Sequence, residues 1–309
     1  IEAEFVDHIR LMLDLYKDRR TDILTYNNKI PGTVGLNGQW QNGGEVLNKG
    51  YEAMLGFFGD REKFHFDLNL GLSYNKSEIV KKPDAVLYNY SYRSEIGKPV
   101  GQNFGYIVDG FWTEQTLSNM TVVPTLGPVQ EGDFKYKDLN NDNIIDNNDM
   151  TAIGYSWMPE YNYFLNLNLQ YDNFYLYVVG QGIRNSSIML GGFYIPFGTQ
   201  GNAFSYAKDS WTKETADKAI YPRLSTVSNS NNNQANDVWL RSRDYFKIRN
   251  VELGYILPQT VFGSDKTVKL YVRGQNLLTV ANEIDFVDPE TLMGYPAMRT
   301  ITLGFSLNY

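Results

Sequence analysis

Alternation of apolar and polar residues, repeated in separate segments along the chain, is the feature that most limits how this sequence can fold. A period of two places successive side chains on opposite faces and predicts a β-strand with one apolar and one polar face. The C-terminal segment ends on an aromatic residue in register with its apolar face, as closing strands of outer-membrane β-barrels do. The last strand of a soluble β-sandwich would give the same local pattern. The apolar residues of this segment are Ile301, Leu303, Phe305, Leu307 and Tyr309.

The same period recurs along the rest of the chain. The longest run places six apolar side chains, from Phe64 to Tyr74, on one face, which is long for an edge strand of a soluble protein. Barrels of the outer membrane repeat such half-apolar strands in segments of about ten residues. About nine strands are expected, covering residues 1–5, 9–16, 50–57, 64–75, 161–171, 174–181, 250–257, 268–275 and 301–309.

The connections between these strands alternate between short and long. Short turns are expected near Asp7, Asp60, Asp172 and Gly263. In a membrane barrel all short turns lie on one side and all long loops on the other, whereas a sandwich has no reason to obey this rule. The whole chain, 1–309, is therefore predicted to be all-β and to form part of a transmembrane antiparallel β-barrel. Its long extracellular loops are expected at about 20–46, 76–157, 185–243 and 281–297.

Composition narrows the function classes. No apolar run reaches the length of about 18 residues that a transmembrane helix needs, and cysteine is absent, which removes thiolate metal sites. The net charge of −7 without a basic cluster makes nucleic acid an unsuitable partner. The first residues lack the basic start and apolar core of a signal peptide. The chain is expected to be a fragment of a longer protein.

An Asn/Asp-rich stretch from Asp138 to Asp149 carries the sharpest local motif. Its oxygen-bearing side chains follow the ligand order of a twelve-residue calcium loop. Asn143 takes the position that needs a left-handed residue, and Ile145 is expected to anchor the loop in apolar surroundings. A solvated loop tip is the alternative. The predicted ligands of a structural Ca²⁺ are Asp138, Asn140, Asp142, the carbonyl of Ile144, Asp146 and Asp149.

Signals for catalysis are weak, and the chain is predicted not to be an enzyme. The two histidines, His8 and His65, are far apart in the sequence, so a zinc site or a catalytic triad is not expected. Carboxylates on the polar faces, such as Glu52, Asp67 and Glu252, are explained by a polar barrel lumen. Aromatic residues of the long loops could stack on sugars or peptide side chains, or form the small cores of the loops themselves. The substrate-binding candidates are Trp40, Tyr88, Tyr90, Trp112 and Trp211.

Several blocks together resemble the SusC/RagA type of TonB-dependent outer-membrane transporter. The resemblance extends over essentially the whole chain, the blocks follow the order of the family, and they correspond to the C-terminal barrel portion, roughly the last third of such a transporter. The blocks are Gly132–Asp138 with the Asn/Asp-rich stretch, Trp211–Thr212 with Tyr221–Leu224, Trp239–Arg241, Asp244–Pro258, Arg273–Thr279 and Asp288–Glu290.

The resemblance implies a barrel of about 22 strands in the bacterial outer membrane, closed by a plug, energised through TonB and lidded by a SusD-type surface lipoprotein. The implied function is uptake of oligosaccharides or oligopeptides, and the sequence does not choose between these substrates. The plug and the segment that contacts TonB are absent from this chain, so both partners would belong to the remaining part of the transporter. A passive porin or adhesin-like barrel and a soluble β-rich carbohydrate-binding domain are the alternatives.

Overall fold

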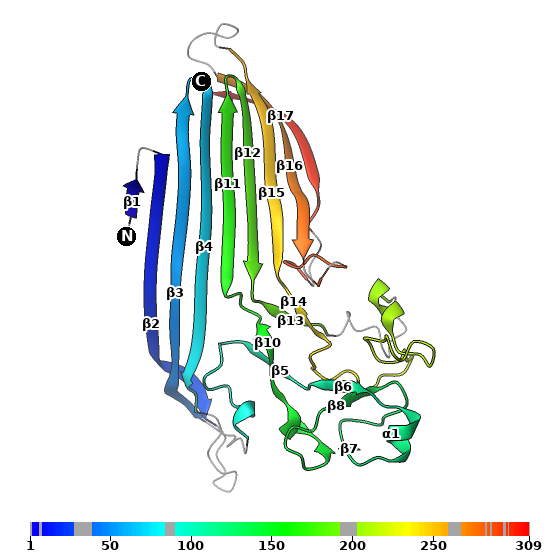
Figure 1. Cartoon of the computed structure of the whole chain (residues 1–309). Helices are drawn as coiled ribbons and strands as arrows, with labels where there is room; N and C mark the ends of the chain where they lie inside the picture. Colours follow the sequence, from blue (N-terminus) through cyan, green and yellow to red (C-terminus); the bar gives the residue numbers. More distant parts are fainter. Residues whose placement is uncertain are drawn as a thin grey trace.

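A curved sheet of nine antiparallel strands forms most of the molecule in the computed structural model (Figure 1). The structure describes residues 2–5, 8–27, 39–83, 90–191, 203–258, 267–281, 283–284, 286–292, 295 and 297–308. Each long strand pairs with the next long strand along the chain. The strands of this sheet are β1 (Glu2–Phe5), β2 (Ile9–Asn27), β3 (Gln39–Arg61), β4 (Phe64–Lys81), β11 (Tyr161–Tyr171), β12 (Phe174–Arg184), β15 (Tyr245–Ile256), β16 (Thr267–Ala281) and β17 (Thr300–Asn308).

Small elements fill the two longest connections, β4–β11 and β12–β15. None of the helices in the described part of the chain is long and apolar enough to cross a membrane. The small elements are β5 (Gln102–Gly105), β6 (Val108–Phe111), α1 (Glu114–Ser118), β7 (Val123–Pro124), β8 (Phe134–Tyr136), β9 (Ile144–Ile145), β10 (Thr151–Ser156), β13 (Ser187–Met189), β14 (Leu240–Ser242) and the 3-10 helices η3 (Ser91–Arg93), η4 (Asn147–Asp149) and η6 (Ser205–Asp209).

The register of the sheet keeps the predicted apolar residues on one face. Leu68 of β4 pairs with Phe57 of β3 on one side and with Leu167 of β11 on the other. Many side chains of this face remain open, and Leu303 and Phe305 are 79% and 74% exposed. An exposed apolar face of this extent is a contact surface rather than a water-facing one. The predicted all-β, antiparallel fold with long strands is confirmed.

Aromatic rings border the apolar face at both ends, as predicted for an interface girdle. At the loop end, the ring of Tyr74 lies 5.5 Å from that of Tyr51 and 4.7 Å from that of Tyr161. At the turn end, the rings of Phe174 and Tyr255 lie 4.7 Å apart. A span of about 9–11 residues per tilted strand is what a bilayer requires, and the distance from one aromatic border to the other along β4 is of this size.

Several strands are longer than the sequence pattern predicted, β2 and β3 most of all, and β4 runs to Lys81 within the predicted loop 76–157. The segment 20–46 was expected to be a loop, but β2 continues to Asn27 and β3 begins at Gln39. The residues between Lys17 and Asp22 are exposed. Beyond the aromatic border polar residues predominate, and the apolar pairs Ile23–Leu24 and Val46–Leu47 are adjacent in sequence, so the period of two is lost although the backbone pairing continues. Residues 28–38 lie outside the described part.

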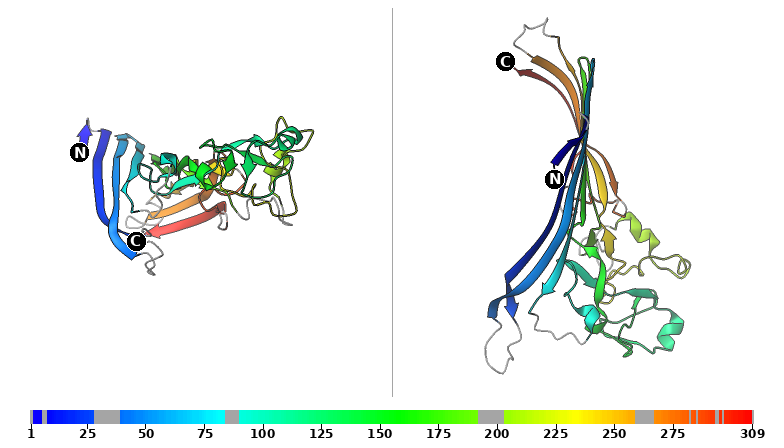
Figure 2. Two further views of the ribbon diagram at one scale, coloured as in Figure 1. Left: turned by 90° about the horizontal axis from the view of Figure 1, so that it is seen from below. Right: turned by 60° about the vertical axis from the view of Figure 1, so that its left-hand side comes forward.

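The long connections and the short turns lie at opposite ends of the sheet (Figures 1 and 2). The β4–β11 and β12–β15 connections share a hydrophobic core in which Phe134 and Trp239 are fully buried. The buried Asp133 binds Arg223 at 2.8 Å and accepts a hydrogen bond from Asn232 at 2.9 Å. Because these partners come from different connections, they join both loops into one body at the loop end. The core consists of Tyr106, Phe134, Tyr136, Ile145, Tyr221 and Trp239.

Candidate functional site

The polar face of the sheet carries the candidate site. Two of its carboxylates are held within the wall itself. Glu252 binds Arg273 at 2.5 Å and accepts a hydrogen bond from the Tyr175 hydroxyl at 2.7 Å, and Asp67 accepts one from Asn69 at 2.5 Å. These contacts join neighbouring strands or nearby residues of the polar face, and a role in the polarity of a barrel lumen stays a prediction.

A cavity of about 730 Å³ lies on the polar face along β2, β3, β4, β11 and β12. The ring of Phe164 lies directly over Gly71, where a Cβ atom would overlap it. Phe164 is 44% exposed although it belongs to the polar face. At the edge of this cavity, Asp14 of β2 and Glu52 of β3 are direct cross-strand partners. The cavity thus combines an exposed aromatic ring with two opposed carboxylates.

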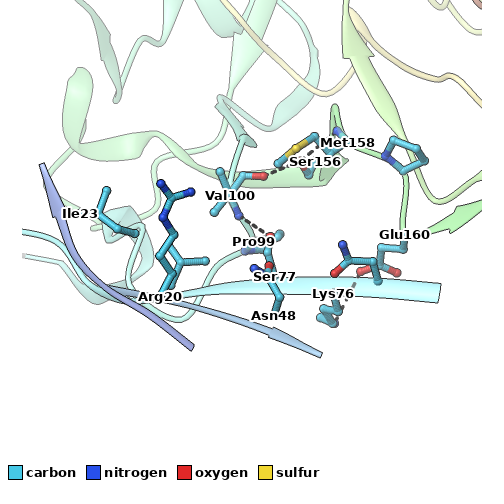
Figure 3. Close-up of a pocket in the computed structure, with 13 residues that line it drawn as sticks. Arg20, Ile23, Asn48, Lys76, Ser77, Pro99, Val100, Ser156, Met158 and Glu160 are labelled. Atoms are coloured by element: carbon cyan, nitrogen blue, oxygen red, sulfur yellow. Dashed lines mark hydrogen bonds and ion pairs between the residues drawn. The ribbon is translucent and has the colours of Figure 1, made fainter. Parts of the chain in front are cut away.

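A second cavity, of about 390 Å³, lies where the outer ends of β2–β4 meet the β4–β11 connection (Figure 3). Hydrogen bonds fix its wall: the Val100 amide donates to Ser77 Oγ at 3.0 Å, and Ser156 Oγ donates to the Val100 carbonyl at 2.7 Å. Arg20 and Asn48 line the strand side. Both cavities lie on the same face of β2, β3 and β4. The first lies within the sheet, and the second lies at the loop end of these strands.

A buried ion-pair network attaches the β16–β17 connection to the polar side of β15. Lys247 is only 1% exposed and binds Asp288 at 2.5 Å and Glu290 at 3.1 Å. Arg249 binds Glu290 as well. Arg243 donates to the main-chain carbonyls of Pro289 and Glu290 at 3.0 and 3.1 Å. Arg243, Lys247 and Arg249 therefore hold the acidic segment around Asp288 and Glu290, which lies about forty residues further along the chain.

The carboxylates of this network have shifted pKa values. Burial alone would raise the pKa of Asp288, but the hydrogen bond and charge of Lys247, with backbone hydrogen bonds, hold it below its ordinary value. Burial likewise opposes ionisation of Glu290, and hydrogen bonds and charges from Arg249 and Lys247 lower its pKa. Both groups are therefore held in their charged form.

The Asn/Asp-rich loop has the backbone that the motif predicted. Asn143 is left-handed with φ of 64°, and Ile145 is buried in the core shared by the loops. Asp138 accepts hydrogen bonds from the amides of Asn141 and Asn143 at 2.7 and 2.8 Å. This carboxylate closes the turn in which the left-handed residues lie.

The acidic side chains of the loop are occupied by its own backbone. Asp149 is fully buried and accepts hydrogen bonds from the amides of Leu139 and Asp146 at 2.8 and 2.9 Å. Burial raises the pKa of Asp149, while these backbone hydrogen bonds oppose the rise. Within the described residues, no three acidic or histidine side chains converge in a way that could hold a metal ion. The frame of the loop fits a calcium site, whereas its side chains do not gather as a ligand set.

The predicted aromatic candidates do not form one site. Trp112 is 3% exposed, and its amide donates to the Asp133 carbonyl, so its ring is not open for stacking. Trp211 packs against Gly132. Trp40 is 65% exposed on β3 beside Tyr26. Tyr90 stacks on Tyr92 near the Asn/Asp-rich loop. Tyr88 lies outside the described residues.

Sequence reasoning missed Phe164, Asp14 and the role of Lys247. A signal for Phe164 was available, since it is an aromatic residue among the asparagines of its face. Lys247 gave no comparable signal, because its partners follow it by 41 and 43 residues.

Comparisons with known proteins match this geometry. No family model matches the sequence. The TonB-dependent receptors P3 and P26 of Formosa agariphila are 25% and 27% identical over 99% and 95% of the chain. The chain aligns with one part of each of these TonB-dependent receptors. It spans about one third of the length of these curated relatives, namely 33% and 32%.

Solved transporter structures share the fold of this receptor portion. The RagAB peptide importer in its "open-open" state superimposes with a TM-score of 0.72 over 98% of the chain, at 18% identity. In its "closed-closed" state the TM-score is 0.70 over 96% of the chain, at 20% identity. The chain covers 33% of each matched chain. The sheet thus has the fold of one segment of a transporter barrel, and the relatives that it matches are TonB-dependent receptors and a peptide importer.

Proposed function

We propose that this receptor portion forms the C-terminal barrel wall of an energy-dependent nutrient importer that works with a SusD-type surface lipoprotein. The observation that carries the proposal is the two-sided wall: an apolar face bordered by aromatic rings, and a polar face with two cavities beneath the joined loops. The apolar face would contact lipid, and the polar face would line the path of the substrate. The remaining barrel, the plug and the contact with TonB would come from the rest of the transporter.

Uptake by the complete transporter tests this proposal. Labelled oligopeptide should enter cells that carry the intact TonB system, and uptake should fall to background when TonB is deleted. The SusD-type lipoprotein should co-purify with the transporter in detergent. Uptake that continues without TonB would instead identify a passive barrel. Purification of the complete protein without detergent would revive the soluble binding domain.

The cavity on the polar face favours oligopeptides with a cationic group over glycans. Asp14 and Glu52 face each other across neighbouring strands, and like charges in this position destabilise a sheet. Other carboxylates of the same face, such as Glu252, are paired. A lysine or arginine side chain, or a peptide N-terminus, would neutralise the pair while its apolar part packs on Phe164. RagAB, whose structures share this fold, is a peptide importer.

Removing the charges of Asp14 and Glu52 should therefore remove the preference for cationic peptides. In the complete transporter, Asp14→Asn with Glu52→Gln should weaken binding of a lysine-containing hexapeptide by about tenfold, since hydrogen bonds to charged groups contribute about 1.5–3 kcal/mol. Its glutamine analogue should bind as before. Isothermal titration calorimetry with both peptides measures the ratio. Asp18→Asn, on the same strand, is the control. Equal loss for both peptides would show that the pair supports the wall or the plug instead.

We also propose that the Asn/Asp-rich loop binds a structural Ca²⁺, on the support of its left-handed Asn143 and its anchored Ile145. The carboxylates of the loop, which accept hydrogen bonds from its own amides in this structure, would have to turn towards the ion. Asp149 stands at the last ligand position, where a longer glutamate would bind the ion with both oxygens. Because the shorter aspartate makes fewer contacts, a dissociation constant on the order of 10⁻⁴ M is expected. Tb³⁺ luminescence should appear on titration and disappear with Asp138→Asn plus Asp142→Asn, but persist with Asp217→Asn. Equal Tb³⁺ luminescence from these variants would show that the loop is a solvated turn without a bound ion.

A further inference from the structure

Three lysines form a row across neighbouring strands on the apolar side of the sheet. Lys49 of β3 is the direct cross-strand partner of Lys17 of β2 and of Lys76 of β4. All three side chains are exposed. Since side chains of one strand alternate between faces, the row lies on the same face as Leu15, Tyr51 and Tyr74, two residues away along each strand.

The row begins where the apolar face ends. The outward positions of β3, β4 and β11 between the two aromatic borders are all apolar or glycine, and the lysines occupy the first outward positions beyond the border at the loop end. Rings of Tyr51, Tyr74 and Tyr161 separate them from the aliphatic band. In a membrane barrel this level coincides with the lipid headgroups of one leaflet.

The charges of the row are only partly balanced by the protein. Like charges placed directly opposite each other on a sheet are destabilising, and here two such pairs are adjacent. Glu160 lies 3.7 Å from Lys76, and Glu78 is the next outward residue on β4. Arg19, the next on β2, is already bound to Glu45 at 2.6 Å. The carboxylates Asp14 and Glu52 belong to the opposite face. A net positive strip therefore remains at this level.

We infer that Lys17, Lys49 and Lys76 bind the phosphate groups of an anionic lipid headgroup, such as a phosphorylated glycolipid of the outer leaflet. Lysine holds phosphate as a compact point charge on a flexible stem, and the adjacent tyrosine rings provide an amphipathic surface at headgroup level. A headgroup phosphate would relieve the repulsion within the row. This inference rests on the proposed membrane placement of the barrel and not on the substrate.

Displacement of a fluorescent lipid A analogue from the complete transporter in detergent tests the inference. Basic residues near an anionic surface contribute about 1 kcal/mol each, which corresponds to about a fivefold change in affinity per lysine. Lys17→Gln, Lys49→Gln and Lys76→Gln combined should weaken binding of phosphorylated lipid A by about 100-fold. Binding of the same lipid without its phosphates should be weak and unchanged.

A matched control removes three exposed lysines of the loops, Lys137, Lys208 and Lys218, and should leave lipid binding unchanged. Equal losses in the control would overturn the inference in favour of a general charge effect. Inorganic phosphate should compete poorly, because it lacks the acyl chains that anchor the headgroup beside the apolar face. If inorganic phosphate displaces the lipid at equal concentration, the row binds free phosphate and the assignment to lipid is wrong. The lipid-binding result does not depend on whether the transporter takes up peptides.

Discussion

Replacing Lys247 with methionine is expected to release the β16–β17 connection from the polar face and to destabilise the barrel strongly. Lys247 is 1% exposed and binds two carboxylates. Removing one partner of a buried ion pair costs about 3–5 kcal/mol, because the remaining charge stays buried without compensation. The lower part of this range is expected, since Glu290 is 31% exposed and keeps Arg249. Urea unfolding in lipid vesicles measures the free energy, and hydrogen exchange at 286–292 reports the release.

Two further variants separate the network from a general loss of charge. Lys213→Met removes a surface ion pair with Glu131, in which the side chains are 72% and 30% exposed, and should change the free energy by less than about 1 kcal/mol. Adding Asp288→Asn to Lys247→Met should recover part of the loss. Unchanged protection of 286–292 in Lys247→Met would mean that Arg243 and Arg249 suffice to hold the segment.

The network also predicts a response to acid. Because the folded-state pKa values of Asp288 and Glu290 lie below their ordinary values, their contribution is complete above the unfolded pKa values of about 4. It is lost as the pH falls through the folded values. The protection factors of 286–292, which compare the exchange rates with those of an unfolded chain at the same pH, should therefore be constant at neutral pH and fall only below about pH 4.

The sheet could be predicted from the sequence because its two faces differ in polarity. Phe64 to Tyr74 reads as a strand since every second residue must be apolar. The outer ends of β2 and β3 could not be predicted in the same way. Water contacts both faces there, so apolar and polar residues do not alternate along the sequence. Only the backbone pairing in the structure identifies these segments as strands. The pairs formed by 39–46 are visible only in the structure.

The candidate site was less accessible to sequence reasoning, because it depends on register and on distant contacts. Lys17, Lys49 and Lys76 become a row only when two hairpins are in register. Trp112 looked available in a loop, but the folded connection buries its side chain. Local spacing did predict the left-handed Asn143, since that conformation is decided within a few residues.

Replacing Leu68 with arginine is expected to destabilise the barrel by about 2–4 kcal/mol, the range for a basic residue on the lipid face near the bilayer midplane. Leu68 lies between the aromatic borders formed by Phe64 and Tyr74, and its cross-strand partners Phe57 and Leu167 are apolar. A guanidinium at this position would have to leave its water shell or distort the bilayer. The free energy of unfolding in phospholipid vesicles measures the effect.

The neighbouring residue supplies the matched control. Asn69 points to the polar face and donates to Asp67, so Asn69→Arg should change the free energy by about 0.5 kcal/mol or less, as for other substitutions in water. Leu68→Ala separates lost packing from charge and should cost less than Leu68→Arg. In thicker bilayers the arginine should become more costly, because its path to the interface is longer. Equal costs for Leu68→Arg and Asn69→Arg would mean that hydrocarbon does not distinguish the two faces, and the assignment of the apolar face to lipid would be wrong.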